Sequence, residues 1–150
     1  LTVADLADTP VQEISTGVPF LFIPIKNMQA IKRIKFRSDI WEQKLSQYGQ
    51  FFVFTLETTY PTSTVHSRMF GPSMNIAEDA ASGAPSGPLG CYLVKYGLVQ
   101  GNPAKITSEQ GFEMGRPSYI HIEIGHSDGA INFVGVGGEC VYIGEGFLEI

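Results

Sequence analysis

The sequence predicts an α+β domain in which strands, mostly antiparallel, outnumber helices. Segments rich in β-branched and aromatic residues recur along the chain, and Gly-Gly and Asp-Gly pairs separate the later ones as hairpin turns would. The strands do not alternate with helices in the way that parallel β-α-β units require. A helix with glycine along one side interrupts the strands in the middle of the chain, and such a helix suits a place inside a tight β-sheet.

Length and composition agree with one domain over residues 1–150. A chain of 150 residues lies within the usual size range of a single domain. Apolar residues make up 43% of it and charged residues 17%, which is typical of a globular protein and too apolar for a disordered one.

The first part of the chain predicts a hairpin followed by two short helices. Gly17 and Pro19 lie between two β-rich runs, where glycine's backbone freedom and proline's fixed φ favour a bend. Apolar residues at helical spacing follow, and Asp39 is the expected N-cap of the second helix. The predicted elements are strands at residues 11–16 and 20–25 and helices at residues 27–34 and 39–48.

The remainder predicts two strands, a segment of small residues, one helix and a β-rich end. Gly, Ala, Ser and Pro dominate residues 72–88. The apolar stretch after them reads as helix, and glycine-containing turns separate the strands beyond it. The predicted elements are strands at residues 51–58 and 64–71, a helix at 89–99, and strands at 105–109, 118–125, 130–136 and 139–150.

The small residues before this helix predict a site for an anion. The first N–H groups of a helix have no partner within it, and the helix dipole favours negative charge there. The small side chains of Ser82, Gly83 and Ala84 leave those N–H groups within reach of a ligand carboxylate. Gly83, Gly87 and Gly90 also leave one side of the helix nearly bare, which predicts close packing against strands.

Asp79 stands just before this helix start and has two interpretations. It is an N-cap, or it is a carboxylate that transfers a proton or orients a substrate beside the bound anion. Proton transfer at carbon usually needs a second group across the substrate, and the spacing alone identifies none.

Other candidate residues give weaker signals. His66 and Arg68 share a face of a predicted strand and are candidates to line a carboxylate-binding cleft, although such a pair more often belongs to a half-exposed sheet face. Three scattered histidines and the single cysteines Cys91 and Cys140 show no metal-binding spacing, so we expect no metal site. Cys91 is expected to be a structural thiol.

Charge and hydropathy exclude several classes of function. The formal net charge is −5 and the isoelectric point is about 5.1, which disfavours nucleic acid as a partner. No apolar run approaches the roughly 20 residues of a membrane span, so we expect no membrane partner. Two cysteines without a disulfide pattern suggest a reduced, cytoplasmic protein.

The motifs resemble those of the PhzF-like, phenazine-biosynthesis-like proteins. The resemblance covers nearly the whole chain, and the motifs occur in the family's order. They are Ser15-Thr-Gly-Val-Pro19, Arg68-Met-Phe-Gly-Pro72, Glu78-Asp-Ala-Ala-Ser-Gly83, Glu109-Gln-Gly-Phe-Glu-Met-Gly-Arg-Pro-Ser118 and Val136-Gly-Gly-Glu-Cys-Val141.

This resemblance implies the diaminopimelate-epimerase-like fold, in which each of two α+β halves wraps a sheet around a central helix. It implies that the chain corresponds to the second, C-terminal half, whereas the family's catalytic glutamate belongs to the first. Asp79 matches the family's second-half active-site aspartate, and Gly83 matches a glycine that faces the ligand. Ala84 replaces a serine of the family's usual E-D-P-A-T-G-S motif, and Ser82 replaces its threonine.

Two functions remain open at this point. The first is the C-terminal domain of an isomerase that moves a proton on a small carboxylated substrate without cofactor or metal, with an active site completed by a first half. The second is a non-catalytic small-molecule-binding or assembly module, which the substitution at Ala84 favours. In either case we expect a homodimer or a complex with a first-half chain, because the cleft face would otherwise be bare.

Overall fold

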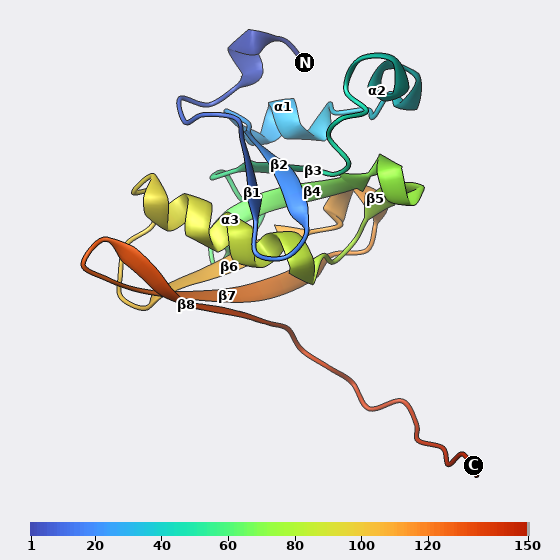
Figure 1. Cartoon of the computed structure of the whole chain (residues 1–150), viewed down its shortest axis with the longest axis vertical. Helices are drawn as coiled ribbons and strands as arrows, with labels where there is room; N and C mark the ends of the chain where they lie inside the picture. Colours follow the sequence, from blue (N-terminus) through green and yellow to red (C-terminus); the bar gives the residue numbers. More distant parts are fainter. Residues whose placement is uncertain (150) are drawn as a thin grey trace.

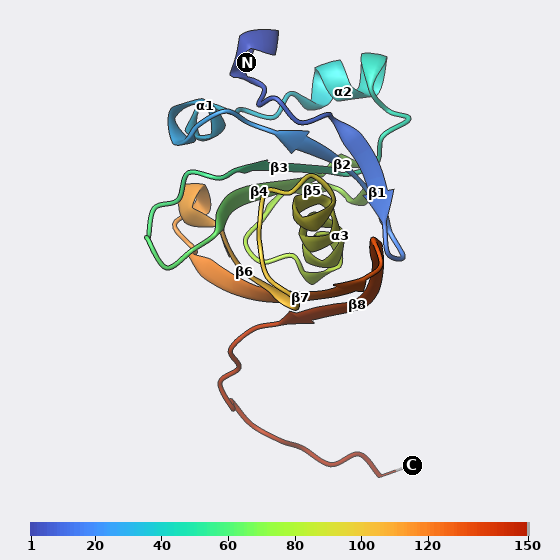
Figure 2. The same ribbon diagram turned by 90° about the vertical axis from the view of Figure 1, so that its left-hand side faces the viewer.

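A strongly curled sheet wrapped around one helix organises the molecule, as the computed structural model of the chain shows for residues 1–149. Figure 2 looks along helix α3 and shows the sheet surrounding it on most sides. The strands are β1 (Gln12–Ser15), β2 (Pro19–Pro24), β3 (Phe51–Thr55), β4 (Val65–Gly71), β5 (Ile76–Asp79), β6 (Ala104–Gln110), β7 (Ser118–Ser127) and β8 (Ala130–Gly137). The helices are α1 (Met28–Lys32), α2 (Ser38–Lys44) and α3 (Gly83–Lys95), with 3₁₀ turns η1 (Val3–Asp5), η2 (Pro72–Met74) and η3 (Phe112–Met114).

The sheet is mixed, as α+β architecture allows. Its strand order is β1-β2-β3-β4-β6-β7-β8, and β5 pairs with β4 outside this path. The β2–β3 and β4–β6 pairs are parallel, and the other pairs are antiparallel. Two strands therefore share one edge of β4: β6 pairs with its first part and β5 with its second.

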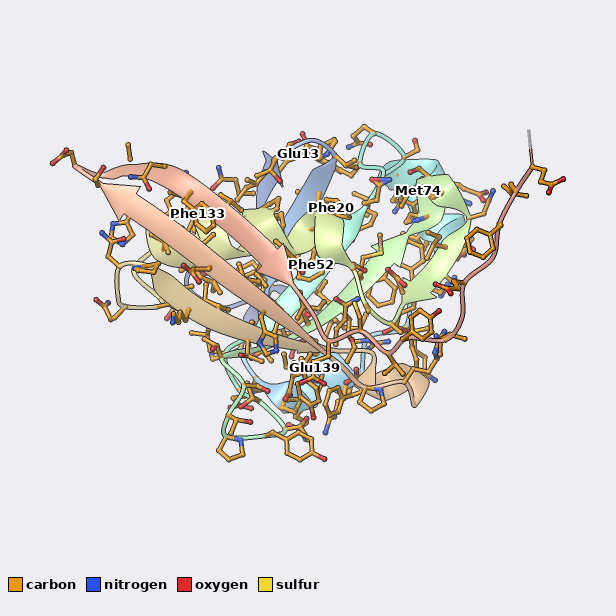
Figure 3. All side chains as sticks on the ribbon, turned by 90° about the horizontal axis from the view of Figure 1, so that it is seen from below. Glu13, Phe20, Phe52, Met74, Phe133 and Glu139 are labelled. Atoms are coloured by element: carbon orange, nitrogen blue, oxygen red, sulfur yellow. The ribbon has the colours of Figure 1, made fainter. Side chains whose placement is uncertain are left out.

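Two hydrophobic clusters cover opposite faces of the central strands. Apolar side chains of β2, β3, β4, β6 and β7 meet Leu89, Tyr92 and Leu93 of α3 inside the curl. Figure 3 shows Phe20 and Phe52 beside α3 in this interior. On the other face, α1 packs against Phe51 and Phe70. Strand β3 is therefore buried on both sides, which explains its unbroken run of aromatic and β-branched residues.

Helix α3 fits inside the curl because two of its glycines meet strands. A Cβ added to Gly90 would lie 2.7 Å from side-chain carbons of Ile122 and Ile124, closer than packed atoms approach. A Cβ on Gly87 would lie 3.0 Å from Cγ1 of Val134. The predicted bare face is thus confirmed at these two positions. It is wrong at Gly83, where an added Cβ would meet open space.

Most predicted elements are present with shifted ends. The Gly17 bend joins β1 to β2, and Asp128 and Gly129 both have positive φ in the β7–β8 hairpin, as a type I′ turn requires. Helix α3 begins at Gly83 rather than residue 89 and ends at Lys95. Strand β5 lies in the small-residue segment, where no strand was expected.

Two predictions near the ends of elements are wrong. Asp39 does not cap α2: its carboxylate accepts hydrogen bonds from the Arg37 guanidinium, and Arg37 is the N-cap residue. Residues 138–149 form no strand but extend away from the body, as Figure 1 shows, because no neighbouring strand lies beside them. The last residue of the predicted strand, Ile150, lies outside the described residues.

The enclosure of α3 makes a testable prediction about its glycines. Gly87→Leu and Gly90→Leu are each expected to destabilise the fold by about 1–3 kcal/mol or more, since overpacking displaces the surrounding strands. Gly83→Leu is the matched control on the same helix, because its side chain would enter open space. Thermal melts of the three variants measure the difference. Equal melting temperatures for all three and the wild type would contradict the enclosed helix.

Candidate functional site

The shared edge of β4 brings two distant segments together. Strand β6 runs parallel to β4 and ends with Gln110 beside Ser67. Strand β5 runs antiparallel to β4 and ends with Asp79 beside Met69, two residues further on. The ends of β5 and β6 therefore point at each other along the same edge. The turn that leads into α3 meets the turn that leads into η3.

The turn before α3 places a serine hydroxyl on the Asp79 carboxylate. Ser82 is the N-cap residue of α3, but its side chain makes no capping hydrogen bond. Its hydroxyl instead donates to Oδ2 of Asp79 over 2.5 Å. The N-cap interpretation of Asp79 is therefore wrong. Its carboxylate is held by the turn and is only partly buried.

The first turn of α3 is open to solvent, as an anion site needs. Gly83 and Ala84 are both exposed. Pro85 follows them and has no N–H, so the backbone N–H groups of Gly83 and Ala84 are the free donors of this helix start. The methyl group of Ala84 offers no hydroxyl to a ligand, so recognition at this position depends on the backbone alone.

His66 and Arg68 lie on the other face of the sheet. Residues directly opposite on paired strands point to the same face, so Asp79 points with Met69 toward α3. His66 and Arg68 alternate with Met69 on β4 and point away from α3. Both are almost completely buried. The structure does not bring them to Asp79, which corrects the expectation that they line one cleft with it.

The three nitrogens of the Arg68 guanidinium all donate hydrogen bonds to other groups of this chain. Its Nε and Nη2 donate to the two carboxylate oxygens of Glu78 over 2.7 and 2.8 Å. Its Nη1 donates to the carbonyl oxygens of Ile31 and Ile34 at the end of α1. Arg68 thus ties α1 to β5 and fixes the residue immediately before Asp79.

Two glutamates likewise hold the His66 imidazole. Nδ1 lies 2.7 Å from Oε1 of Glu109, and Nε2 lies 3.0 Å from Oε1 of Glu113. Burial by itself would lower the pKa of His66, but the hydrogen bonds and charges of Glu113 and Glu109 outweigh it and raise that pKa. Burial would raise the pKa of both glutamates, yet their hydrogen bonds, including those to His66, hold it below its ordinary value.

Sequence reasoning missed Gln110, Gly111 and Ser118, which hold the turn before α3. Gln110 bonds to Asp79 and Ser82, and the Ser118 hydroxyl donates to the Ala80 carbonyl oxygen over 2.5 Å. Gly111 has φ +80°, and a Cβ there would strike the carbonyl oxygens of Arg116 and Ala80. The only available signal was the Gln110-Gly111 pair inside the 109–118 motif. Arg116 of the same motif forms no ion pair with Glu109 or Glu113 in the described part of the chain, and both acids bind His66 instead.

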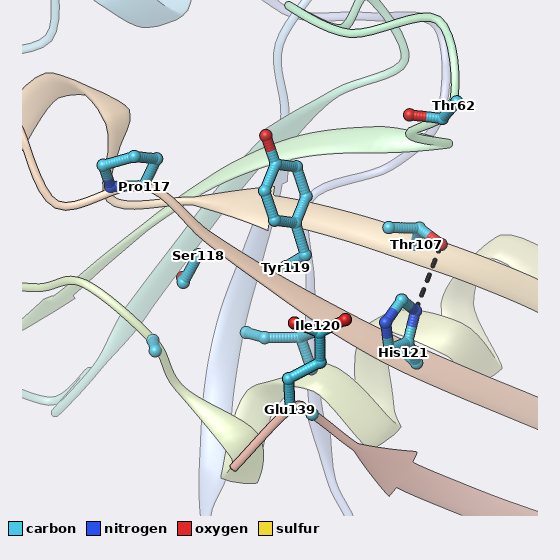
Figure 4. Close-up of a pocket in the computed structure, with 10 residues that line it drawn as sticks. Thr62, Thr107, Pro117, Ser118, Tyr119, Ile120, His121 and Glu139 are labelled. Carbon is cyan, nitrogen blue, oxygen red and sulfur yellow. Dashed lines mark hydrogen bonds between the residues drawn. The ribbon is translucent and has the colours of Figure 1, made fainter. Parts of the chain in front are cut away.

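A cavity of about 560 Å³ lies beside the same turn (Figure 4). Ala81 and Ser118 border it, and His121 and Glu139 line its wall. Nδ1 of His121 lies 3.4 Å from Oγ1 of Thr107, as the dashed line in Figure 4 marks. Neither Asp79 nor Gly83 and Ala84 line this cavity. The first turn of α3 is exposed, and Asp79 beside it is partly buried.

Within residues 1–149, no group of three or more His, Cys, Asp or Glu side chains is placed to hold a metal ion. Both cysteines are free thiols, and burial raises the pKa of Cys91, so its thiol stays protonated at neutral pH. Among the helices of the described residues, none has the length and apolar character that a membrane crossing requires.

Comparison with known proteins identifies the family. The chain belongs to the family described as phenazine biosynthesis-like protein (PhzC-PhzF), which it matches over residues 1–146. It is 31% identical to the uncharacterized isomerase YfhB of Bacillus subtilis, covering 95% of this chain and 49% of that protein. It is 38% identical over 85 residues to the trans-2,3-dihydro-3-hydroxyanthranilate isomerase of Pseudomonas fluorescens, covering 56% of this chain and 30% of that enzyme.

Solved structures give the same result for the fold. A PhzF-family phenazine biosynthesis protein from Bacillus anthracis has a TM-score of 0.77 at 23% identity, over 85% of this chain and 44% of that one. A Pseudomonas aeruginosa protein described as a predicted epimerase has a TM-score of 0.65 at 27% identity, over 95% of this chain and 49% of that one. The expected diaminopimelate-epimerase-like fold is confirmed. The chain spans about half the length of the curated relatives it matches.

The His66 cluster makes stability depend on pH. Because the folded-state pKa of His66 is raised, its contribution is complete below the unfolded value of about 6.5 and is lost as pH rises through the folded pKa. The pKa values of Glu109 and Glu113 are lowered, so their contribution is complete above about 4.3 and is lost as pH falls. We therefore expect the melting temperature to be highest between about pH 4.5 and 6.5.

Two measurements check this dependence. NMR of the imidazole nitrogens should show that His66 titrates above the ordinary histidine value. In His66→Gln, the fall in melting temperature on the alkaline side of the maximum should disappear. An unchanged alkaline fall in this variant would show that other groups cause it.

Proposed function

We propose that this chain is the C-terminal domain of a PhzF-like isomerase that transfers a proton between carbons of a small carboxylated substrate. The observation that carries this proposal is the position of Asp79, whose carboxylate is held by Ser82 beside the exposed first turn of α3. A carboxylate that transfers protons and a site that binds an anion thus lie on one turn. Membership of a family whose relatives are named isomerases supports the proposal.

The proposed reaction needs only proton movement. The N–H groups of Gly83 and Ala84 bind the substrate carboxylate, and the helix dipole favours its charge. A base removes a proton from one carbon, the electron pair shifts through the conjugated substrate, and a proton is returned to another carbon. Asp79 orients the substrate or assists one transfer. No electrons leave the substrate, so the step requires no redox cofactor, and the proposal assigns no part to a metal.

The principal acid or base comes from a first half in this proposal. Asp79 is only partly buried, and within residues 1–149 no other carboxylate or histidine is hydrogen-bonded to its side chain. Proton transfer at carbon is efficient where a second group faces the first across a water-excluding cleft. The relatives are about twice as long as this chain, which leaves room for a domain that supplies both.

A second candidate function is a non-catalytic small-molecule-binding or assembly module. The observation that favours it is Ala84, which stands at the exposed helix start with a methyl group where the family commonly has a serine. The backbone N–H groups would still bind a carboxylate there. Catalysis would be lost if the missing hydroxyl is essential.

Deuterium incorporation tests the isomerase proposal. The protein to assay is the one that the full reading frame, including any part upstream of Leu1, encodes. The probe is trans-2,3-dihydro-3-hydroxyanthranilate in D₂O, followed by NMR. Asp79→Asn should lower the rate of deuterium incorporation at carbon by about 10²-fold or more, because the amide cannot take up a proton. Asp128→Asn, in the exposed β7–β8 turn, is the matched control.

Anthranilate, which has the carboxylate but not the reactive ring, separates the two functions. Shifts of the Gly83 and Ala84 amide signals with anthranilate, but no deuterium incorporation into the probe, would favour the binding module. Incorporation that is equal in wild type and Asp79→Asn would show that Asp79 takes no part.

We also propose that the domain associates, either with a second copy or with a first-half chain. Apolar side chains of the extended segment after β8 are bare: Val141, Ile143 and Phe147 are 82%, 91% and 94% exposed. Phe133 on the edge strand β8 is 52% exposed. Exposed apolar side chains on an edge strand and on the segment after it are available to pack against a partner.

Sedimentation at micromolar concentration tests the association. The isolated chain should behave as a dimer, and a clean monomer of 16.4 kDa would contradict homodimerisation. Phe133→Ser should weaken a dimer that forms through β8, and Asp79→Ala and Arg116→Glu should weaken one that forms through the turn before α3. Lys44→Glu on α2 is the charge-change control. A dimer unaffected by Asp79→Ala and Arg116→Glu would exclude an interface at the turn.

A further inference from the structure

We propose that Gln110 is a positioning residue for Asp79, acting through the hydroxyl of Ser82. The inference rests on the proposed function, and it adds to that function the group that selects which oxygen of Asp79 reacts. It is carried by four hydrogen bonds among three residues at the junction of β5 and β6.

The amide of Gln110 fixes the direction of these hydrogen bonds. Its Nε2 donates to the backbone carbonyl oxygen of Asp79 over 2.7 Å and to Oγ of Ser82 over 3.0 Å. An amide nitrogen only donates, so the Ser82 oxygen is the acceptor of that bond. The single proton of Ser82 is then free to be donated to Oδ2 of Asp79.

The amide oxygen of Gln110 excludes the flipped orientation of the amide group. Oε1 of Gln110 accepts the backbone N–H of Ser82 over 3.4 Å, so a flipped amide would set its nitrogen against another donor. It would also set its oxygen against the Asp79 carbonyl oxygen, where two acceptors would repel. The orientation of Gln110 is therefore determined by its neighbours.

Burial holds this arrangement in place. Gln110 is completely buried and Ser82 is 6% exposed, so water does not compete for their hydrogen bonds. Gly111 has no side chain, which allows the end of β6 to lie directly against Ala80 of the turn. Gln110 therefore acts on the Asp79 carboxylate through Ser82, from the end of a sheet strand.

The consequence is a distinction between the two oxygens of Asp79. Oδ2 is occupied by the Ser82 hydroxyl, whereas Oδ1 has no hydrogen-bond partner in the described part of the chain. A carboxylate that can turn freely presents either oxygen, and most of its orientations are unproductive. With Oδ2 held, Oδ1 is the oxygen that remains available to exchange a proton with substrate.

The test is a double-mutant cycle in the deuterium-incorporation assay. Gln110→Met keeps the size of the side chain and removes the donor, and it should lower kcat about 10²-fold while KM changes by less than about twofold. Ser82→Ala should give a similar loss. The double variant should be no slower than the slower single variant, because both act through one chain of hydrogen bonds. Ser82→Thr, which keeps a hydroxyl, should lose less than Ser82→Ala.

Another buried glutamine supplies the matched control. Gln50 lies in the loop before β3 and Ser73 lies in η2. Nε2 of Gln50 donates to Oγ of Ser73 over 3.1 Å. Gln50→Met is the same substitution in a similar pair away from Asp79, and it should leave kcat unchanged. If Gln110→Met does not fold, Gln110→Leu replaces it, because its side chain also lacks a hydrogen-bond donor.

Three results would overturn the inference: an unchanged kcat in Gln110→Met, an equal loss in Gln50→Met, or losses in kcat that multiply in the double variant. Absence of turnover in the wild type is a failure of the proposed function alone. In that case the ¹³Cγ NMR signal of Asp79 decides. It should shift in Gln110→Met as it does in Ser82→Ala and stay in place in Gln50→Met, and an unmoved signal in Gln110→Met overturns the inference.

Discussion

The pairing of two strands with one edge of β4 is the constraint on which the rest of the site depends. Strands β5 and β6 approach from opposite directions and stop within two residues of each other on β4. Their end residues, Asp79 and Gln110, are 31 positions apart in the sequence yet joined by a hydrogen bond. Neither residue could be held there by local turn structure alone, so the sheet register fixes the geometry of the turn.

The same strand separates two kinds of polar chemistry. On the side facing α3, the carboxylate of Asp79 remains partly accessible and has a hydroxyl as its partner. On the other side, His66 and Arg68 are buried and surrounded by carboxylates. Buried charges cost free energy unless they are paired. His66, Arg68 and their carboxylate partners are paired in this way and hold the fold together. The pleat of one strand therefore places the carboxylate that we propose to react on one face and the charges that hold the fold on the other.

Sequence patterns predicted what local chemistry controls. Gly87 and Gly90 of α3 and the Asp128-Gly129 hairpin were readable because backbone sterics specify them. Asp79 was selected by a family motif, and its part in a site is a proposal. The sequence did not show which residues of β4 share a face with Asp79. His66 and Arg68 alternate correctly, but only the Met69–Asp79 pairing shows that Asp79 lies on the opposite face. Gln110 was missed because its partners are distant in sequence, and buried amides have no periodic pattern.

The separation of the two faces has a consequence for how such a domain can change over evolutionary time. Ala84 and Gly83 are exposed and touch neither hydrophobic cluster, so replacing them leaves the packing of α3 undisturbed. Gly90 and Gly111 have no such freedom, since any side chain there collides with neighbours. At the substrate site that we propose, preference can therefore change by exchange of a few exposed residues at the helix start, whereas exchanges at Gly90 or Gly111 would disturb the scaffold.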